Sequence, residues 1–219
     1  MNNFFKRYEN GDRPLGSRLA TMKIALSLLN RSQANNFVET GTTRKTKRTH
    51  PNVEDRAADG SSTLIFGDFA TKYGGHVWTC DINAQNIENC KEATEEYKDS
   101  ITYEVNDSVS FLRDFKEGID FLYLDSLDSD HPRAHEHQLA EIEACFSRLS
   151  KNSIVLLDDL GGKTKLSVEF LKKNNWCQIN LSIPTPSHYN NFMQGIFVNE
   201  NFLYVNHSSI SIEKRFKDV

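Results

Sequence analysis

The chain has 219 residues, and 26 Lys and Arg against 30 Asp and Glu give it a formal net charge of −4. This length predicts one domain with additions, and an apolar share of 38% excludes full disorder. The longest apolar runs are far too short to span a membrane, and the first residues lack the apolar stretch of a secretory signal. The mildly acidic balance argues against nucleic acid as a partner held by charge. Four separated cysteines without a C-x-x-C pair predict reduced thiols in a cytoplasmic protein.

An amphipathic helix is predicted near the start of the chain. Leucines and one methionine recur at spacings of four, three, four and three from Leu15 to Leu29, which places them on one helix face. This stripe can pack on a sheet of the same chain or on a second subunit, so a homo-oligomer stays open. We treat residues 1–33 as a helical extension and residues 34–219 as the main domain.

The main domain begins with a short apolar strand that ends in a glycine turn, over residues 36–41. Residues 42–59 follow, and they are polar, rich in Lys and Arg, and without periodicity. They predict a long exposed loop inserted into the domain. A basic loop beside a site can act as a lid for an anionic substrate, although a solvated surface loop is the simpler interpretation.

From residue 61 onward, helical and strand patterns alternate. Helices are predicted over residues 61–73, 84–97, 108–115, 131–149 and 163–173. Strands are predicted over residues 76–80, 101–105, 119–124, 153–157, 177–183 and 194–198. Because the strands are nearly continuous apolar runs, they predict an α/β fold with a doubly wound, mostly parallel sheet and helices on both faces.

Acidic residues recur where the predicted strands end. They are Glu39, Asp81, Asp107, Asp125, and the pair Asp158 and Asp159. Ligands of open parallel sheets bind beyond the carboxyl ends of the strands, so these acids predict a binding site at that edge. Taken singly, each of these acids could instead be a helix N-cap, and Asp107 is the one for which this alternative is weighed.

The first strand end indicates a nucleotide-type site. Gly41 allows a sharp turn and close approach of a ligand, and Gly60-Ser61-Ser62-Thr63 opens a helix whose free N–H groups face the same edge. Asp81 suits hydrogen bonds to the two hydroxyls of a ribose. Treating residues 42–59 as an insertion restores the usual spacing of about 20 residues between glycine turn and acid. The further glycines of a dinucleotide fingerprint are missing, which counts against NAD.

The order and spacing of these residues resemble the motifs of class I S-adenosylmethionine-dependent methyltransferases. The likeness is closest to the macrocin-type metal-dependent small-molecule O-methyltransferases, and it rests on Glu39-Thr40-Gly41-Thr42, Asp81, Asn106-Asp107-Ser108, Leu124-Asp125 and Leu157-Asp158-Asp159. It covers roughly residues 36–198 and implies a seven-stranded Rossmann-like sheet. The implied cofactor is S-adenosylmethionine, contacted by Glu39, Thr40, Gly41, Thr42, Ser62, Asp81, Asp107, Ser108 and Asp125.

The same resemblance implies a divalent cation, most plausibly Mg²⁺, held by Asp125, Asp158 and Asp159. Physical chemistry agrees, because three converging carboxylates repel one another unless a cation lies between them. The cation would hold adjacent hydroxyls of the substrate and lower their pKa. The implied activity is O-methylation of a hydroxylated small molecule, with a sugar as one candidate.

The catalytic residues expected from this resemblance are Asp125 and three general-base candidates, Asp128, Asp130 and His131. His131 and His135 could also share a helix face as metal ligands, although a solvated helix start is the simpler interpretation. His135 and His137 cannot share a face, and both are left out of the predicted site. The alternatives are an NAD-dependent oxidoreductase, a hydroxylase of the same fold and a noncatalytic nucleotide-binding protein.

Overall fold

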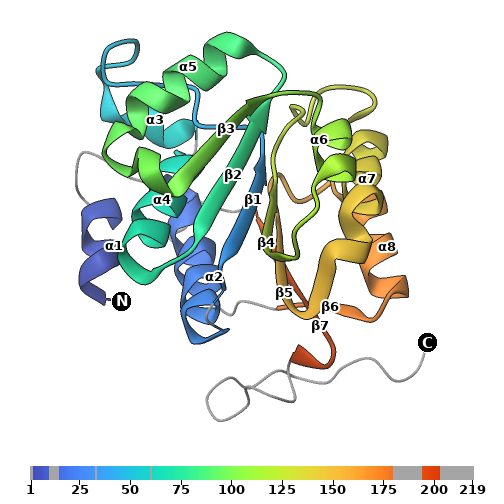
Figure 1. Cartoon of the computed structure of the whole chain (residues 1–219). Helices are drawn as coiled ribbons and strands as arrows, with labels where there is room; N and C mark the ends of the chain where they lie inside the picture. Colours follow the sequence, from blue (N-terminus) through green and yellow to red (C-terminus); the bar gives the residue numbers. More distant parts are fainter. Residues whose placement is uncertain (1, 10–14, 33, 60, 180–193, 203–219) are drawn as a thin grey trace.

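The computed structural model describes residues 2–9, 15–32, 34–59, 61–179 and 194–202. Its centre is a seven-stranded sheet of order β3-β2-β1-β4-β5-β7-β6 (Figure 1). The first five of these strands run parallel, and β7 is antiparallel to both β5 and β6. The strands are β1 (Asn36–Thr40), β2 (His76–Asp81), β3 (Ile101–Val105), β4 (Ile119–Leu124), β5 (Leu149–Leu157), β6 (Trp176–Gln178) and β7 (Gly195–Asn199). The predicted α/β fold with a mostly parallel, seven-stranded sheet is confirmed.

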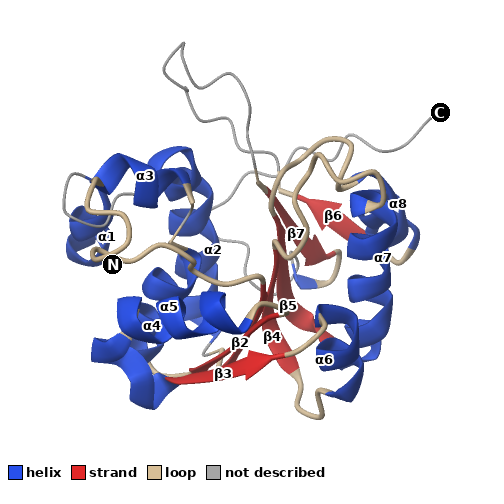
Figure 2. Ribbon diagram, turned by 90° about the horizontal axis from the view of Figure 1, so that it is seen from above, coloured by secondary structure: helices blue, strands red, loops and turns tan. Residues whose placement is uncertain are grey.

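Helices cover both faces of the sheet (Figure 2). On one face lie α1 (Asn2–Glu9), α2 (Leu19–Ser32), α3 (Val53–Ala58), α4 (Ser62–Tyr73) and α5 (Ala84–Ala93), and on the other lie α6 (Ser108–Asp114), α7 (Ala134–Cys145) and α8 (Lys165–Lys173). The described residues also contain the short 3-10 helices η1 (Gly16–Arg18), η2 (Glu95–Ser100) and η3 (Phe146–Arg148).

Successive strand residues point to opposite faces, which explains the continuous apolar runs of the sequence. In β1, Phe37 belongs to the core beneath α1, α2 and α4, whereas Val38 belongs to the core beneath α6, α7 and α8. Tyr123 and Leu124 divide in the same way in β4. Both faces of each central strand are therefore buried, and polar side chains are left to the strand ends.

The leucine stripe near the start of the chain packs on the sheet of its own chain. Leu15, Met22, Leu26 and Leu29 are buried, and they share one core cluster with sheet residues and with Phe4 of α1. Helix α2 contacts β5 and β7. The stripe is therefore not available to a second subunit.

The segment of residues 42–59, called the inserted segment below, differs from the predicted exposed loop. It contains α3, and Thr42, Thr43, Thr46 and Arg56 are buried in it. The buried side chains among the described residues of the segment are thus three threonines and an arginine, and not apolar residues. Most of its other described side chains are exposed, so the prediction holds for them and fails for α3 and these four residues.

Other boundaries differ by a few residues. Helix α7 begins at Ala134 instead of residue 131, α5 ends at Ala93 and gives way to η2, and β5 begins four residues earlier than predicted. Residues 180–183 of the predicted sixth strand lie outside the described residues. No helix in the described part of the chain is both long and apolar enough to cross a membrane.

Candidate functional site

Backbone hydrogen bonds bring the predicted strand ends into one row. The N–H of Asp125 donates to the carbonyl of Thr40 at 2.9 Å, and the N–H of Asp158 donates to the carbonyl of Leu124 at 3.2 Å. The N–H of Asn106 likewise donates to the carbonyl of Asp81 at 3.2 Å. The ends of β1, β4 and β5 are thereby joined, as are those of β2 and β3.

Gly41 turns the chain sharply at the end of β1. Its φ is +77°, and a Cβ at this position would lie only 2.3 Å from the carbonyl oxygen of Asp125. A side chain here would therefore clash with the backbone and require a left-handed conformation. The turn brings the ends of β1 and β4 into direct contact.

Glu39 lies beneath this turn and is almost fully buried. Its Oε2 accepts hydrogen bonds from the hydroxyls of Thr63 in α4, at 2.6 Å, and Thr79 in β2, at 2.7 Å. Burial raises the pKa of this carboxyl group to about 7, although interactions with Ser62, Thr63 and Thr79 lower it. Glu39 thus joins β1, β2 and the start of α4 from below.

The start of α4 is tied to the inserted segment by hydroxyl groups. The Thr63 hydroxyl accepts a hydrogen bond from the N–H of Thr43 at 3.0 Å and lies 3.2 Å from the Thr42 hydroxyl. Ser61, at the N-cap of α4, is in the left-handed conformation with φ of 44°, and its hydroxyl donates to the carbonyl of Arg56 at 3.1 Å. The buried Ser62 follows at the first helical position.

Asp81 ends β2 with its carboxylate held by local groups. It accepts hydrogen bonds from the N–H of Asn83 at 2.8 Å and from the amide of Asn86 at 3.1 Å. Two apolar side chains beside it are exposed, Ile82 at 77% and Val105 at 56%. No pattern in the sequence indicates their exposure, which depends on the pairing of β2 with β3.

Asp107 is the N-cap of α6, so the competing interpretation of this residue is confirmed. Its Oδ1 accepts a hydrogen bond from the N–H of Ser110 at 2.9 Å, and this bond holds the pKa of Asp107 below its ordinary value. The neighbouring Ser108 hydroxyl lies 3.0 Å from Nε2 of His137. Asp107 keeps its place at the strand edge, with one oxygen engaged by its own helix.

His137 was left out by sequence analysis, and the structure places it at this edge. Its Nε2 lies 3.1 Å from the hydroxyl of Ser126, which donates to the buried Glu141 at 2.6 Å. These residues meet because α7 passes the ends of β3 and β4. No spacing in the sequence indicates the contact, since Ser108 and His137 lie in separate helices.

The three acids predicted to bind a metal are instead engaged by cationic side chains of the chain itself. Nζ of the buried Lys163 lies 3.0 Å from Oδ1 of Asp125 and 3.3 Å from Oδ2 of Asp159. Asp158 is fully buried, and its Oδ2 accepts hydrogen bonds from Arg18 at 2.9 Å and from the hydroxyl of Tyr123 at 3.0 Å.

Electrostatics agree with this pairing. Burial and the nearby charge of Asp158 raise the pKa of Asp125 well above its ordinary value, against the opposing effect of Lys163. Burial lowers the pKa of Lys163, but the charges of Asp125 and Asp159 outweigh it and raise that pKa. Lys163 is therefore a protonated cation between two acids.

The residues do not fit the predicted Mg²⁺ site. Mg²⁺ and Ca²⁺ need several oxygen ligands at about 2.0–2.6 Å, whereas an ammonium group stands between Asp125 and Asp159 and a guanidinium holds Asp158. Across the described ranges, no three His, Cys, Asp or Glu side chains are gathered in a way that could hold a metal ion. The cationic groups beside these three acids are those of Arg18 and Lys163.

The three general-base candidates lie in the loop between β4 and α7. Asp128, Asp130 and His131 are all exposed. One oxygen of Asp128 lies 3.8 Å from the Arg44 guanidinium of the inserted segment, and Nδ1 of His131 accepts the N–H of Arg133 at 3.2 Å. The loop thus approaches the inserted segment, and the role of these residues stays a prediction.

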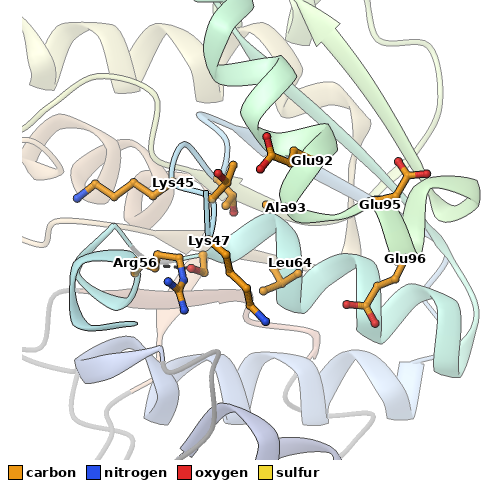
Figure 3. Close-up of a pocket in the computed structure, with 11 residues that line it drawn as sticks. Lys45, Lys47, Arg56, Leu64, Glu92, Ala93, Glu95 and Glu96 are labelled. Atoms are coloured by element: carbon orange, nitrogen blue, oxygen red, sulfur yellow. Dashed lines mark hydrogen bonds between the residues drawn. The ribbon is translucent and has the colours of Figure 1, made fainter. Parts of the chain in front are cut away.

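A cavity of about 390 Å³ lies between the inserted segment and the helices α4 and α5. Figure 3 shows basic side chains of the inserted segment, among them Lys47 and Arg56, and acidic side chains of α5 and η2, Glu92, Glu95 and Glu96. The acids at the strand ends do not line it. The cavity adjoins the start of α4 through Ser61 and Leu64 instead.

Comparisons with known proteins agree with a methyltransferase fold. Residues 57–160 match a family model described as a methyltransferase domain. The solved structure of the SAH-bound Podospora anserina methyltransferase PaMTH1 is similar at 13% identity, with 90% of this chain and 84% of that chain covered and a TM-score of 0.57. No curated protein matches the sequence significantly.

Two further structures show the range of enzymes with this fold. CalS11, described as a TDP-rhamnose 3′-O-methyltransferase, is similar at 15% identity, with 90% and 92% of the two chains covered and a TM-score of 0.54. A candidate rRNA methylase from Clostridium thermocellum is similar at 12% identity, with 80% and 94% covered and a TM-score of 0.53. Because one similar structure is a candidate rRNA methylase, the prediction that excludes nucleic acid as a partner stays untested.

These findings agree with a methyltransferase domain over residues 57–160 and with a fold that solved methyltransferases share. They do not favour the alternative of an NAD-dependent oxidoreductase. At these identities the structural likeness concerns the fold alone, so the macrocin-type resemblance receives no separate support.

Proposed function

We propose that this chain transfers the methyl group of S-adenosylmethionine to a hydroxyl oxygen of a small molecule, with a sugar as the candidate substrate class. The observation that carries this proposal is the meeting of the Gly41 turn with Asp125 at the edge of a sheet of methyltransferase type. CalS11, a described sugar O-methyltransferase of similar fold, supports the choice of substrate class.

The cofactor would lie along the strand ends. The Gly41 turn and the first residues of α4 offer backbone groups to the methionine end, where Thr40, Thr42 and Ser62 also stand. Asp81 would accept hydrogen bonds from the two ribose hydroxyls. The adenine ring would rest against Ile82 and Val105, whose exposed apolar side chains then gain a partner.

The far end of the adenine would face the starts of α6 and α7. Asp107 and Ser108 are expected there from the sequence, and the contact between Ser108 and His137 supports including His137 in the proposed site. Ser126, which follows Asp125, links His137 to Glu141. We propose that this group sets the shape of the adenine site.

The chemical step is an in-line displacement. The acceptor oxygen attacks the sulfonium methyl group, a C–O bond forms, and the C–S bond breaks with its electron pair going to sulfur. The products are the methyl ether and the thioether S-adenosylhomocysteine, and the hydroxyl proton passes to a base. We propose Asp125 as that base, because it is partly exposed at the site and its raised pKa suits proton acceptance. Holding oxygen and methyl carbon at attack distance would supply much of the acceleration.

Calorimetric titration of the full chain with S-adenosylhomocysteine and NAD tests the cofactor. We expect saturable binding of S-adenosylhomocysteine, and Asp81→Ala should weaken it by roughly 1.5–3 kcal/mol, the usual loss of a hydrogen bond to a charged group. Asp114→Ala, which removes an exposed carboxylate at the end of α6, should leave it unchanged. Binding of NAD without binding of S-adenosylhomocysteine would overturn the proposal.

A further inference from the structure

Lys163 occupies the position at which a cation is needed. Its side chain is only 2% exposed, and its Nζ lies between a carboxylate from the end of β4 and another from the turn after β5. The carboxylates of Asp125 and Asp159 keep 27% and 22% of their side-chain surface exposed. The lysine thus approaches from the protein interior, and the acids present their outer sides to the site.

The turn between β5 and α8 fixes Lys163 in this place. Asp159 and Gly161 have positive φ values of 53° and 145°. The hydroxyl of Thr164 accepts the N–H of Gly161 at 3.0 Å and lies 3.2 Å from its carbonyl oxygen. A left-handed aspartate is uncommon and requires support from the surrounding structure. The backbone of this turn therefore fixes where the side chain of Lys163 begins.

Asp158 is held by the N-terminal part of the chain and by β4, although its charge also acts on Lys163 and Asp125. Arg18 and Tyr123 both donate to its Oδ2, and its side chain is wholly buried. A cation arriving from solvent would first meet Asp125 and Asp159, which are partly exposed, whereas Asp158 is buried and already paired with a guanidinium. It would also meet the ammonium of Lys163, which repels it.

We infer that Lys163 is the resident cation of this acid cluster, that it takes the place of a divalent metal, and that it positions Asp125 in the site. The role of Asp125 in methyl transfer rests on the proposed function, but the ion pairs of Lys163 with the two acids do not depend on it. Lys163 acts through Asp125 and is a positioning residue. Methyl transfer at this site then needs no added metal.

Binding of Mn²⁺ alone tests this inference, because electron paramagnetic resonance counts free Mn²⁺ directly. We expect no site-specific Mn²⁺ binding by the wild-type chain. Lys163→Met removes the charge and keeps the length of the side chain, so the two freed acids should bind Mn²⁺ at least about tenfold more tightly. Lys163→Arg keeps the cation and should behave as wild type. Lys165→Met, an exposed lysine two positions along, is the matched control.

Two results would overturn the inference. One is stoichiometric Mn²⁺ binding by the wild-type chain that Asp125→Asn abolishes, and the other is Mn²⁺ binding by Lys163→Met that equals wild type. Circular dichroism and urea unfolding show that each variant is folded. If even the wild-type chain fails to bind S-adenosylhomocysteine, the proposed function fails while the Mn²⁺ result still decides the role of Lys163.

Discussion

Glu39 is the buried carboxyl group that joins the Gly41 turn to β2 and α4, and its ionisation is coupled to folding. In the unfolded chain its pKa is the ordinary 4.5, and in the folded chain it is about 7. Between these values the unfolded chain loses the proton while the folded chain keeps it. Rising pH therefore favours unfolding across this interval, and the whole effect is about 3 kcal/mol once both states are ionised.

Glu39→Gln should remove this pH dependence. The glutamine oxygen can still accept the hydrogen bonds of Thr63 and Thr79, and the side chain carries no charge at any pH. We expect the difference in free energy of unfolding, variant minus wild type, to be larger at about pH 8 than at about pH 5 by about 2 kcal/mol. Urea unfolding at both pH values measures this difference. If this difference is the same at both pH values, Glu39 has the same pKa in the folded and the unfolded chain. The control is Asp114→Asn, which changes an exposed carboxyl group.

Site residues that directly follow a strand could be predicted from the sequence. Site residues that come from distant parts of the chain could not. Asp81 and Asp125 were found because strand ends are visible as breaks in apolar runs. Arg18 lies 140 positions from Asp158, and no local pattern connects the two. Lys163 stands in a polar turn, where a lysine is ordinarily solvated. Pairing of charges across the fold is therefore what the sequence could not reveal.

Among the elements, the inserted segment is the one that sequence patterns described least well. Periodicity detects apolar side chains, and the strands and α4 carry them. The inserted segment is instead fixed by polar contacts: Arg44 pairs with Asp59 at 2.9 Å, and Nη1 of Arg56 donates to the carbonyls of His50 and Pro51 at 2.6 and 2.8 Å. Helix α3, with six residues, is too short to show a periodic pattern.

Arg56→Met should loosen the inserted segment without unfolding the domain. The methionine keeps an apolar stem but loses the two hydrogen bonds to backbone carbonyls, each worth about 1 kcal/mol. Limited digestion with trypsin should then cut faster after Lys47 and Arg48, while the urea midpoint of the domain changes little. Arg113→Met, an exposed arginine on α6, is the control and should not alter the digestion rate. Equal rates in all three proteins would show that Arg56 does not hold the segment.

At the scale of the whole molecule, the N-terminal helices are part of the sheet's packing and also reach the site. Phe4 and Tyr8 of α1 are buried in the core that includes β1 and β4, and the Tyr8 hydroxyl donates to Asp68 of α4 at 2.6 Å. Arg18, between α1 and α2, then holds Asp158 at the end of β5. Arg18 therefore links the N-terminal helices directly to an acid of the strand-end site.

The contribution of the Arg18–Asp158 ion pair to the free energy of unfolding can be measured. Arg18→Met leaves a buried carboxylate without its cation, and loss of one partner of a buried ion pair costs about 3–5 kcal/mol of unfolding free energy. In the double variant Arg18→Met/Asp158→Asn the charge is gone, and the asparagine oxygen can still accept the hydroxyl of Tyr123. The double variant should therefore be more stable than Arg18→Met alone, as urea unfolding of the four proteins in the cycle will show. Additive losses, with the double variant the least stable, would mean that Arg18 stabilises the chain by packing and not through Asp158.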